Sequence, residues 1–195
     1  MTREELEAEL KRRFDLGDLD GTIAAAITGY GDELVGFLTG LAHDPTRADD
    51  VFGATCERMW KGLPKFRWDS TFRVWAYAIA RNEFLRSTRD TARAKREVPV
   101  SQVQSIQQAI DHIRSTTPIH QRTDVKDRYA KVREQLEPED HMLLGLRIDR
   151  QMAWNDIATI LGAEDAAAIR RESAALRKRF ERLKVRLREL LDDPA

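Results

Sequence analysis

Aromatic and basic side chains alternate over residues 60–82, which read WKGLPKFRWDSTFRVWAYAIARN. Six aromatic residues lie within 18 positions of this stretch, nearly half of those in the chain. Rings can stack on unpaired bases, each stack being worth about 1–3 kcal/mol, while guanidinium groups bind backbone phosphates. Hydroxyl and amide groups, such as those of Ser70, Thr71 and Asn82, can read a base that has left the stack. The stretch therefore predicts a surface that holds separated DNA strands.

A plain hydrophobic core is the alternative explanation for the same rings. We expect a helix that begins near Phe72, with Asp69 or Ser70 as its N-cap. Phe72, Trp75 and Ile79 follow helical spacing and should form the buried stripe of this helix. The face expected to meet DNA carries Arg73, Tyr77, Arg81 and Asn82.

The charges of the 195-residue chain are segregated, although its formal net charge is zero. Net charge is −8 over 1–57, +8 over 58–96, −4 over 97–165, +7 over 166–188 and −3 over the last residues. Two basic blocks separated by acidic stretches favour a polyanionic partner such as nucleic acid. Two solvated helix faces would give the same pattern, so charge alone leaves both explanations open.

No constellation of catalytic residues accompanies this pattern. Asp69 and Ser70 have no base near them in the sequence, and the four histidines are scattered. His112 and His120 lack the cysteine or carboxylate neighbours that a metal site needs. A nucleotide-binding loop is also missing. We expect a protein that is not an enzyme and that has no catalytic residues, metal ion or cofactor.

The single cysteine and the hydropathy of the chain bear on its compartment. Cys56 has no partner for an intrachain disulfide, and its apolar neighbours favour a core position over a nucleophile. No apolar run approaches the roughly 18 residues that a membrane span needs. The N-terminal MTREELEAEL predicts an acidic helix and not a signal peptide. We expect a soluble, cytoplasmic protein without membrane contact.

Helical periodicity dominates the sequence, and strand signals are nearly absent. We predict an all-α fold of two small helical domains joined by a flexible linker. The first domain covers 1–96, the linker 97–123 and the second domain 124–195. The linker is rich in Gln, Ser and Thr and holds two prolines, with at most a short helix near 102–114.

The second domain has the pattern of a helix-turn-helix. A short amphipathic helix over 152–162 ends at a glycine, and a long basic helix follows from about 166 to 191. A recognition helix needs cations for phosphates and forked donors for guanine edges, which arginines supply. A solvated Arg-Lys face on an ordinary helical hairpin is the alternative.

The segment ADDVFGATCERMWKGLPKFRWDSTFRVWAYAIARN resembles region 2 of bacterial RNA polymerase sigma factors of the extracytoplasmic-function group. Its Trp, Leu-Pro, Phe-Arg, Asp-Ser, Phe-Arg, Trp, Tyr and Ile-Ala-Arg-Asn elements stand at the spacing of that family. LEPEDHMLLGLRIDRQMAWNDIATILG, with the later helix RKRFERLKVRLREL, is similar to region 4. The resemblance covers roughly 20–90 and 125–191, which is most of the chain.

The resemblance implies a sigma factor that binds the β′ and β subunits of core RNA polymerase and directs the enzyme to promoter DNA. Region 4 would bind the −35 element as duplex, while region 2 would melt the −10 element and capture a flipped base. The residues carried over for polymerase docking are Asp49, Asp50, Gly53, Ala54 and Glu57. Those for the −10 element are Phe66, Arg67, Trp68, Asp69, Ser70, Thr71, Arg73, Trp75, Tyr77, Arg81, Asn82, Arg86 and Arg89. Those for the −35 element are Arg170, Arg171, Ser173, Arg177, Lys178 and Arg179.

The docking helix departs from the family pattern Asp-Ala-Glu-Asp-Leu-Val-Gln-Glu. It should begin at Asp44-Pro45, with Asp as N-cap and Pro in the first turn. Residues 47–54 then read RADDVFGA, so two carboxylates are lost and one arginine is gained. Attraction to the basic coiled coil of β′ should weaken by about 1–3 kcal/mol.

Two interpretations of this departure stay open. Either the remaining acids suffice, or the free protein docks poorly until a protein kinase adds charge. Phosphorylation of Thr46 or Thr55 would add about two negative charges to the docking helix. An anti-sigma factor is the other regulatory partner that the resemblance implies.

Two further departures from the family pattern lie in the segments expected to bind DNA. The turn GAEDAAA is one residue longer than usual, and Glu172 lies within the recognition face, so the −35 sequence is not predictable. Trp68 replaces a small residue in the −10 loop, which predicts an unusual flipped-base preference.

The competing hypothesis is a helix-turn-helix transcriptional regulator that does not dock on core polymerase. The changes at Arg47 and Gly53-Ala54 support it.

Overall fold

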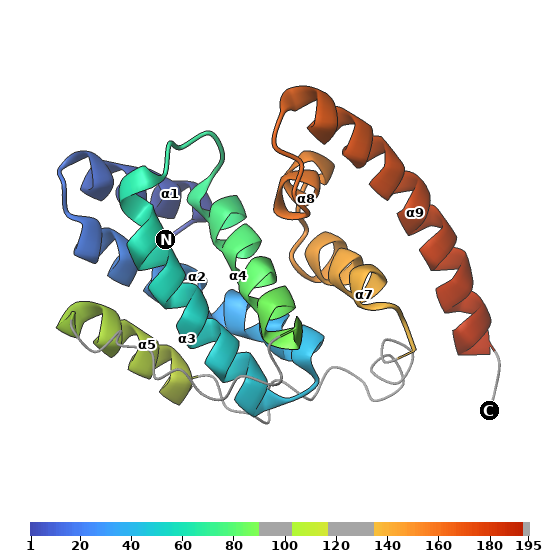
Figure 1. Cartoon of the computed structure of the whole chain (residues 1–195), viewed down its shortest axis with the longest axis horizontal. Helices are drawn as coiled ribbons and strands as arrows, with labels where there is room; N and C mark the ends of the chain where they lie inside the picture. Colours follow the sequence, from blue (N-terminus) through green and yellow to red (C-terminus); the bar gives the residue numbers. More distant parts are fainter. Residues whose placement is uncertain (90–102, 117–134, 193–195) are drawn as a thin grey trace. The chain divides into compact units, whose positions relative to one another are not determined.

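The computed structural model describes residues 1–89, 103–116 and 135–192. It divides the chain into two compact units, 1–118 and 119–195. Every element in the described ranges is helical, which confirms the predicted all-α fold (Figure 1).

The first unit begins with α1 (Arg3–Asp15), which has a capping box at its start. Glu5 N donates to Thr2 Oγ1 at 3.2 Å, and Thr2 N donates to Glu5 Oε2 at 2.7 Å, so two exposed backbone donors are satisfied. The next helix, α2 (Leu19–Ala42), begins at Asp18, whose Oδ1 accepts from Gly21 N at 2.9 Å. The buried stripe of α1 packs against α2.

The third helix, α3 (Pro45–Gly62), begins where the sequence predicts. Asp44 Oδ1 accepts from Thr46 N at 2.9 Å, and Pro45 occupies the first turn, where its missing N–H costs nothing. A 3-10 turn, η1 (Leu63–Lys65), ends the helix, and the loop 66–71 leads into α4 (Phe72–Arg89).

The helix α2 is central to the first unit, because α1, α3, α4 and α5 (Gln104–Thr116) all pack against it. Burying one large apolar side chain contributes about 1.5–3 kcal/mol. The largest fully buried side chains of the chain come from these helices and from η1: Leu10, Ile23, Ile27, Leu34, Leu38, Phe52, Met59, Leu63, Phe72, Tyr77, Ile106 and Ile113.

The helix α5 lies inside the segment 97–123 that the sequence assigns to a linker. Its buried residues Ile106, Ala109, Ile110 and Ile113 have the spacing of one helix face. A Cβ built on Gly31 of α2 would lie 2.7 Å from Ile113 Cγ1, so the two helices approach closely. The first unit therefore extends beyond the predicted boundary at residue 96, and residues 97–102 and 117–123 lie outside the described residues.

The second unit contains α7 (Pro138–Leu144), the π-helical turn η4 (Gly145–Asp149), α8 (Trp154–Ile160) and α9 (Ala166–Asp192). The helices α8 and α9 pack against each other, and Gly162 between them has φ +108°, which favours glycine. This is the predicted helix-turn-helix. The buried side chains of α7 and η4 include Met142, Leu143, Leu144 and Leu146.

The described residues were searched for membrane spans and metal sites. None of the helices in these ranges is both long and apolar enough to cross a membrane. Within the same ranges, no group of three or more His, Cys, Asp or Glu is placed to hold a metal ion. Cys56 is buried, and burial raises the pKa of its thiol, so it is a poor nucleophile.

Candidate nucleic-acid interface

The rings around the loop 66–71 stack on one another. Phe66 and Trp75 lie nearly parallel, with their centroids 4.6 Å apart. The Trp68 ring lies 4.9 Å from that of Phe66 and 5.6 Å from that of Phe14 in α1. Trp68 has φ +59°, an uncommon value for a bulky residue, and its Nε1 is buried without a hydrogen-bond partner among the described residues. The predicted stacking residue is thus folded against its own unit.

The outward edge of the same loop is polar. Arg67 and Asp69 are exposed and form an ion pair of 2.9 Å. Ser70 Oγ donates to the Thr71 carbonyl at 3.2 Å, and Thr71 Oγ1 accepts from Val74 N at 3.2 Å. The capping role that the sequence assigns to Asp69 or Ser70 therefore belongs in part to Thr71.

Two predicted DNA contacts of α4 are core residues. Arg73 is 8% exposed and Tyr77 is 0% exposed. The Arg73 guanidinium donates to both carboxylate oxygens of Glu33, at 2.6 and 2.9 Å, and Tyr77 Oη donates to the Glu33 carbonyl at 3.3 Å. The prediction that these two side chains face DNA is wrong, because the helix is rotated relative to the expected phase. Its buried face includes Arg73, Tyr77, Ala80 and Phe84, whereas Trp75 and Ile79 are only half-buried.

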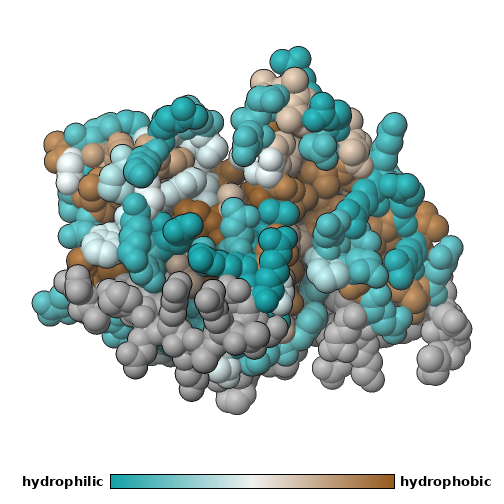
Figure 2. Space-filling model, in the orientation of Figure 1, coloured by the Kyte–Doolittle hydropathy of each residue, from teal (hydrophilic) through white to brown (hydrophobic). Residues whose placement is uncertain are grey.

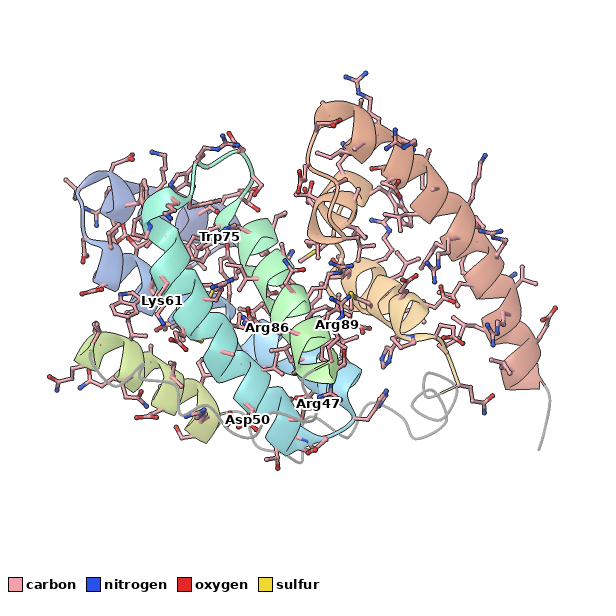
Figure 3. The ribbon with its side chains drawn as sticks, viewed as in Figure 1. Arg47, Asp50, Lys61, Trp75, Arg86 and Arg89 are labelled. Atoms are coloured by element: carbon pink, nitrogen blue, oxygen red, sulfur yellow. The ribbon has the colours of Figure 1, made fainter. Side chains whose placement is uncertain are left out.

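A different face of α4 carries the remaining predicted contacts. Trp75, Asn82, Arg86 and Arg89 share this face, because they are spaced by seven, four and three residues. Trp75 lies at the opposite end of the helix from Arg86 and Arg89 (Figure 3), and the last three of the four are exposed. Arg81 is half-buried, with Nη1 3.2 Å from Asn82 Oδ1. We call Trp75, Asn82, Arg86 and Arg89 the α4 stripe.

The N-terminus of α4 is held by a residue that sequence reasoning missed. Glu7 in α1 accepts hydrogen bonds from the backbone N–H groups of Phe72 and Arg73, at 2.8 and 2.9 Å. Tyr30 Oη donates to the same carboxylate at 2.7 Å, and burial followed by this contact raises the pKa of Tyr30. A partner 65 positions away in the sequence leaves no spacing signal, so only the folded chain reveals it.

The predicted docking residues lie on one side of α3, and the unit itself neutralises most of their charge. Asp49 Oδ1 is 3.0 Å from Arg114 Nε of α5, and Glu57 forms an ion pair with Lys61. Asp50 is exposed on the same helix (Figure 3). Gly53 and Ala54 are half-buried. A Cβ on Gly53 would lie 3.6 Å from Arg114 Nη2, so the end of α5 lies beside this part of α3.

Arg47, the base that replaces an acid of the family pattern, turns toward α4. Its Nε and Nη2 are 3.4 and 3.2 Å from Ser87 Oγ, and its guanidinium lies 5.1 Å from the centre of the Phe84 ring. The Arg47 side chain is half-buried there, and its guanidinium points toward α4 and not toward the docking residues of α3.

The two candidate phosphorylation sites differ in access. Thr46 is exposed in the first turn of α3. Thr55 is 0% exposed, and its Oγ1 donates to the Val51 carbonyl at 2.7 Å. A kinase cannot reach Thr55 in the folded unit, which corrects the expectation for that residue.

In the second unit, the outer face of α9 is basic. Its exposed predicted contacts are Arg170, Arg171, Arg177 and Lys178. Among the described residues, the ion pair of Arg171 is a long one of 3.8 Å with Glu172, its neighbour in the sequence. The guanidinium and ammonium groups of these four residues are therefore available for phosphates.

Two predicted −35 contacts instead hold the second unit together. Ser173 is 2% exposed, and its Oγ donates to Asn155 Oδ1 of α8 at 2.8 Å. Arg179 donates to Asp140 at 2.5 Å and to Glu139 at 2.7 Å, both in α7. The prediction that Ser173 and Arg179 face DNA is corrected, because their polar groups are used between helices.

Hydrophilic residues cover much of the face drawn in Figure 2, with hydrophobic residues in patches between them. Large hydrophobic residues that are exposed include Leu16, Ile148 and Val185. Single exposed residues of this kind are ordinary on protein surfaces, so charge and hydrogen-bonding groups define the candidate interface.

Comparison with known proteins gives matches of three kinds: a family model, a relative in sequence and a solved structure. A family model for sigma-70 region 2 matches residues 26–94. The RNA polymerase sigma-H factor of Pseudomonas aeruginosa is 25% identical over 167 residues, covering 83% of this chain and 85% of that protein. The sigma factor RpoE of Bartonella quintana, solved as a co-crystal with the anti-sigma factor NepR, shares the fold. Its TM-score is 0.56 at 17% identity, over 93% of this chain and 99% of that one.

The region 2 match covers the loop 66–71 and the whole of α4, where the rings and arginines lie. The sigma-H relative aligns across most of both chains, including parts of both units. Together with the shared fold, these matches agree with the resemblance read from the residues. Residues 26–94 match sigma-70 region 2, and the chain as a whole is similar to bacterial sigma factors in sequence and fold.

Proposed function

We propose that this chain is a sigma factor, which binds the β′ and β subunits of core RNA polymerase and directs transcription from its own set of promoters. The second unit would bind the −35 element as duplex through α9. The first unit would melt the −10 element and hold the separated strand along α4. Binding supplies the free energy for strand opening, and no hydrolysis is required of this chain.

The observation that carries this proposal is a basic, exposed surface on each unit. On the first unit, Arg86 and Arg89 follow Asn82 on the outer face of α4, and the polar edge of the loop 66–71 lies near its start. On the second unit, four basic residues are exposed on the helix that follows the turn of a helix-turn-helix. Phosphate contacts of this kind supply the sequence-independent part of DNA affinity.

The residues proposed to contact DNA are the predicted ones that the fold leaves exposed or half-buried. For the −10 element they are Phe66, Arg67, Trp68, Asp69, Ser70, Thr71, Trp75, Arg81, Asn82, Arg86 and Arg89. For the −35 element they are Arg170, Arg171, Arg177 and Lys178.

Control of docking is the second part of the proposal. Two of the three docking acids form ion pairs inside the unit, so the free chain offers little charge to a basic partner. A phosphate on Thr46 would add about two negative charges. It would sit at the N-terminus of α3, where the helix dipole favours an anion by about 0.3–1 kcal/mol. An anti-sigma factor is a second candidate regulator, since the Bartonella neighbour was solved with one.

The test of docking control compares polymerase capture by variants of the two threonines. Thr46→Asp should retain more core polymerase than Thr46→Ala, because it places an acid at the exposed helix start. Thr55→Ala serves as the control, since its hydroxyl is buried and should not affect capture. Equal capture by the two Thr46 variants would rule out control by charge at this residue.

The test of promoter recognition uses purified core polymerase on genomic DNA, with and without this protein. We expect new RNA 5′ ends that share a sequence about 10 and 35 base pairs upstream. A helix-turn-helix regulator that does not dock is the competing function, favoured by the altered docking helix. Such a regulator would bind duplex DNA and give no new 5′ ends with core enzyme alone.

A further inference from the structure

We propose that Glu7 is a positioning residue for the −10 recognition loop, acting through the N-terminus of α4. This inference rests on the proposed melting function of the first unit. Glu7 lies in α1, which precedes the segment matched by the region 2 family model.

The Glu7 carboxylate completes the cap of α4, to which Thr71 contributes one acceptor. The first N–H groups of any helix have no partner within the helix. Glu7 accepts from the first two, those of Phe72 and Arg73, and Thr71 Oγ1 accepts from the third, that of Val74. A carboxylate at this end also meets the positive end of the helix dipole. The start of α4 is thereby fastened to α1.

The same face of α1 contacts the middle of the loop. Glu7, Lys11 and Phe14 are spaced by four and three residues, which places them on one side of the helix. Lys11 Nζ lies 5.6 Å from the centre of the Trp68 ring, and the Phe14 ring meets Trp68 edge-on at 5.6 Å. The helix α1 therefore contacts both Trp68 in the loop and Phe72, the first residue of α4.

The other end of the loop is also fixed. Phe66 N donates to the Leu63 carbonyl at 2.9 Å, which closes the η1 turn. The six residues 66–71 thus run between a closed turn and a capped helix start. A short loop with two fixed ends has fewer conformations to lose when it binds a flipped base, so its affinity for that base is higher.

The Tyr30 hydroxyl is a further donor to the Glu7 carboxylate. Tyr30 is 2% exposed, and its hydroxyl donates to Glu7 Oε1, the oxygen that also accepts from Arg73 N. Since Tyr30 comes from α2, three helices meet at this one side chain. Tyr30→Phe removes the supporting bond and leaves both bonds to α4 intact, which makes it a matched control.

The experiment compares Glu7→Ala and Glu7→Gln with the controls Tyr30→Phe and Glu4→Gln, the latter an exposed acid one turn earlier. Each full-length variant is bound to core polymerase. Each complex is offered two probes, a pool of random single-stranded 10-mers and a pool of random duplexes, and the recovered DNA is sequenced. Measurements are made at a temperature where circular dichroism shows every variant folded.

We expect Glu7→Ala to lower enrichment of the single-strand motif about tenfold, because two hydrogen bonds to a charged acceptor are lost. Glu7→Gln keeps one acceptor oxygen and should give an intermediate loss, while both controls should match the wild type. Duplex enrichment should be the same in all five proteins. General destabilisation of the protein would not lower single-strand enrichment in this graded way while leaving duplex enrichment unchanged.

Two outcomes would overturn the proposal on Glu7. Either Glu7→Ala enriches the single-strand motif as well as the wild type, or it loses duplex enrichment by the same factor. The proposed function fails in a different way: wild-type complex would then recover no single-strand motif at all, which also removes the basis for a positioning role.

Discussion

Arg73 and Glu33 form a bidentate ion pair inside the first unit, with Nε–Oε1 and Nη2–Oε2 distances of 2.6 and 2.9 Å. The Tyr77 ring lies 5.5 Å from the same guanidinium. An arginine expected to bind DNA is therefore part of the interior of the helical bundle, where it links α4 to α2.

Arg73→Met should lower the free energy of unfolding by about 2–4 kcal/mol, because it leaves the Glu33 carboxylate, whose side chain is only 17% exposed, without its partner. The double variant with Glu33→Leu should recover part of this loss, since both charges are then removed. Urea unfolding followed by circular dichroism measures both changes. Arg67→Met is the control, because its ion pair with Asp69 is exposed and worth about 1 kcal/mol at most. Equal effects of Arg67→Met and Arg73→Met would contradict the structural role.

Ser173 and Arg177 should separate stability from DNA binding on the same helix. Ser173→Ala removes the buried hydrogen bond to Asn155 and should cost about 0.5–1.5 kcal/mol of stability, without changing the salt dependence of duplex binding. Arg177→Ala should leave stability unchanged and reduce the slope of log affinity against log salt by about one. Binding titrations at several salt concentrations check this, and a reversed pattern would place Ser173 on the DNA face.

Two helical glycines should respond to alanine with opposite signs. Alanine in a helix is favoured over glycine by about 0.8–1.0 kcal/mol. Gly53→Ala should gain most of this, since the new Cβ would meet only Arg114 Nη2 at 3.6 Å. Gly31→Ala should instead destabilise by about 1–3 kcal/mol, because its Cβ would lie 2.7 Å from Ile113 of α5. Thermal unfolding of both variants measures the difference, and a gain in Gly31→Ala would mean that α5 does not pack there.

Arg114→Gln should strengthen docking on core polymerase. It releases Asp49 from an ion pair in which both side chains are about 40% exposed. The expected gain is about two- to fivefold in affinity at low salt, since exposed pairs are worth about 0.2–1 kcal/mol. Arg12→Gln, which removes an exposed pair with Glu9 in α1, is the control and should have no effect. Unchanged or weaker docking of Arg114→Gln would show that Asp49 is not part of the docking surface.

Local sequence signals predicted the helices well. Asp44-Pro45 marked the start of α3, and Gly162 marked the end of the first helix of the helix-turn-helix. A short helix near 102–114 was expected, but the Gln, Ser and Thr content of the segment assigned it to the linker. The spacing of Ile106, Ala109, Ile110 and Ile113 would have predicted that this helix packs on the first unit.

Contacts between distant residues could not be predicted in this way. Arg73 was expected on the surface because the helical phase placed it away from the Phe72, Trp75 and Ile79 stripe, yet Glu33, 40 positions earlier, compensates its charge inside the unit. The bond between Glu7 and the start of α4 could not be predicted either, because its partners are 65 positions apart in the sequence. Trp68 could not be placed either, since no periodicity exists in a loop and its neighbour Phe14 comes from another helix.

Strand opening at the −10 element tests the central claim most directly. Permanganate, which oxidises unpaired thymines, is applied to genomic DNA with core polymerase alone, with core plus this protein, and with core plus the variant Arg86→Ala/Arg89→Ala. With the wild-type protein we expect reactive thymines about 10 base pairs upstream of the RNA starts, and with core polymerase alone we expect none. The variant should give weaker reactivity than the wild type, because it lacks two cations of the α4 stripe that are proposed to bind phosphates. Identical reactivity with core polymerase alone and with the wild-type protein added would contradict the claim that this chain opens promoters.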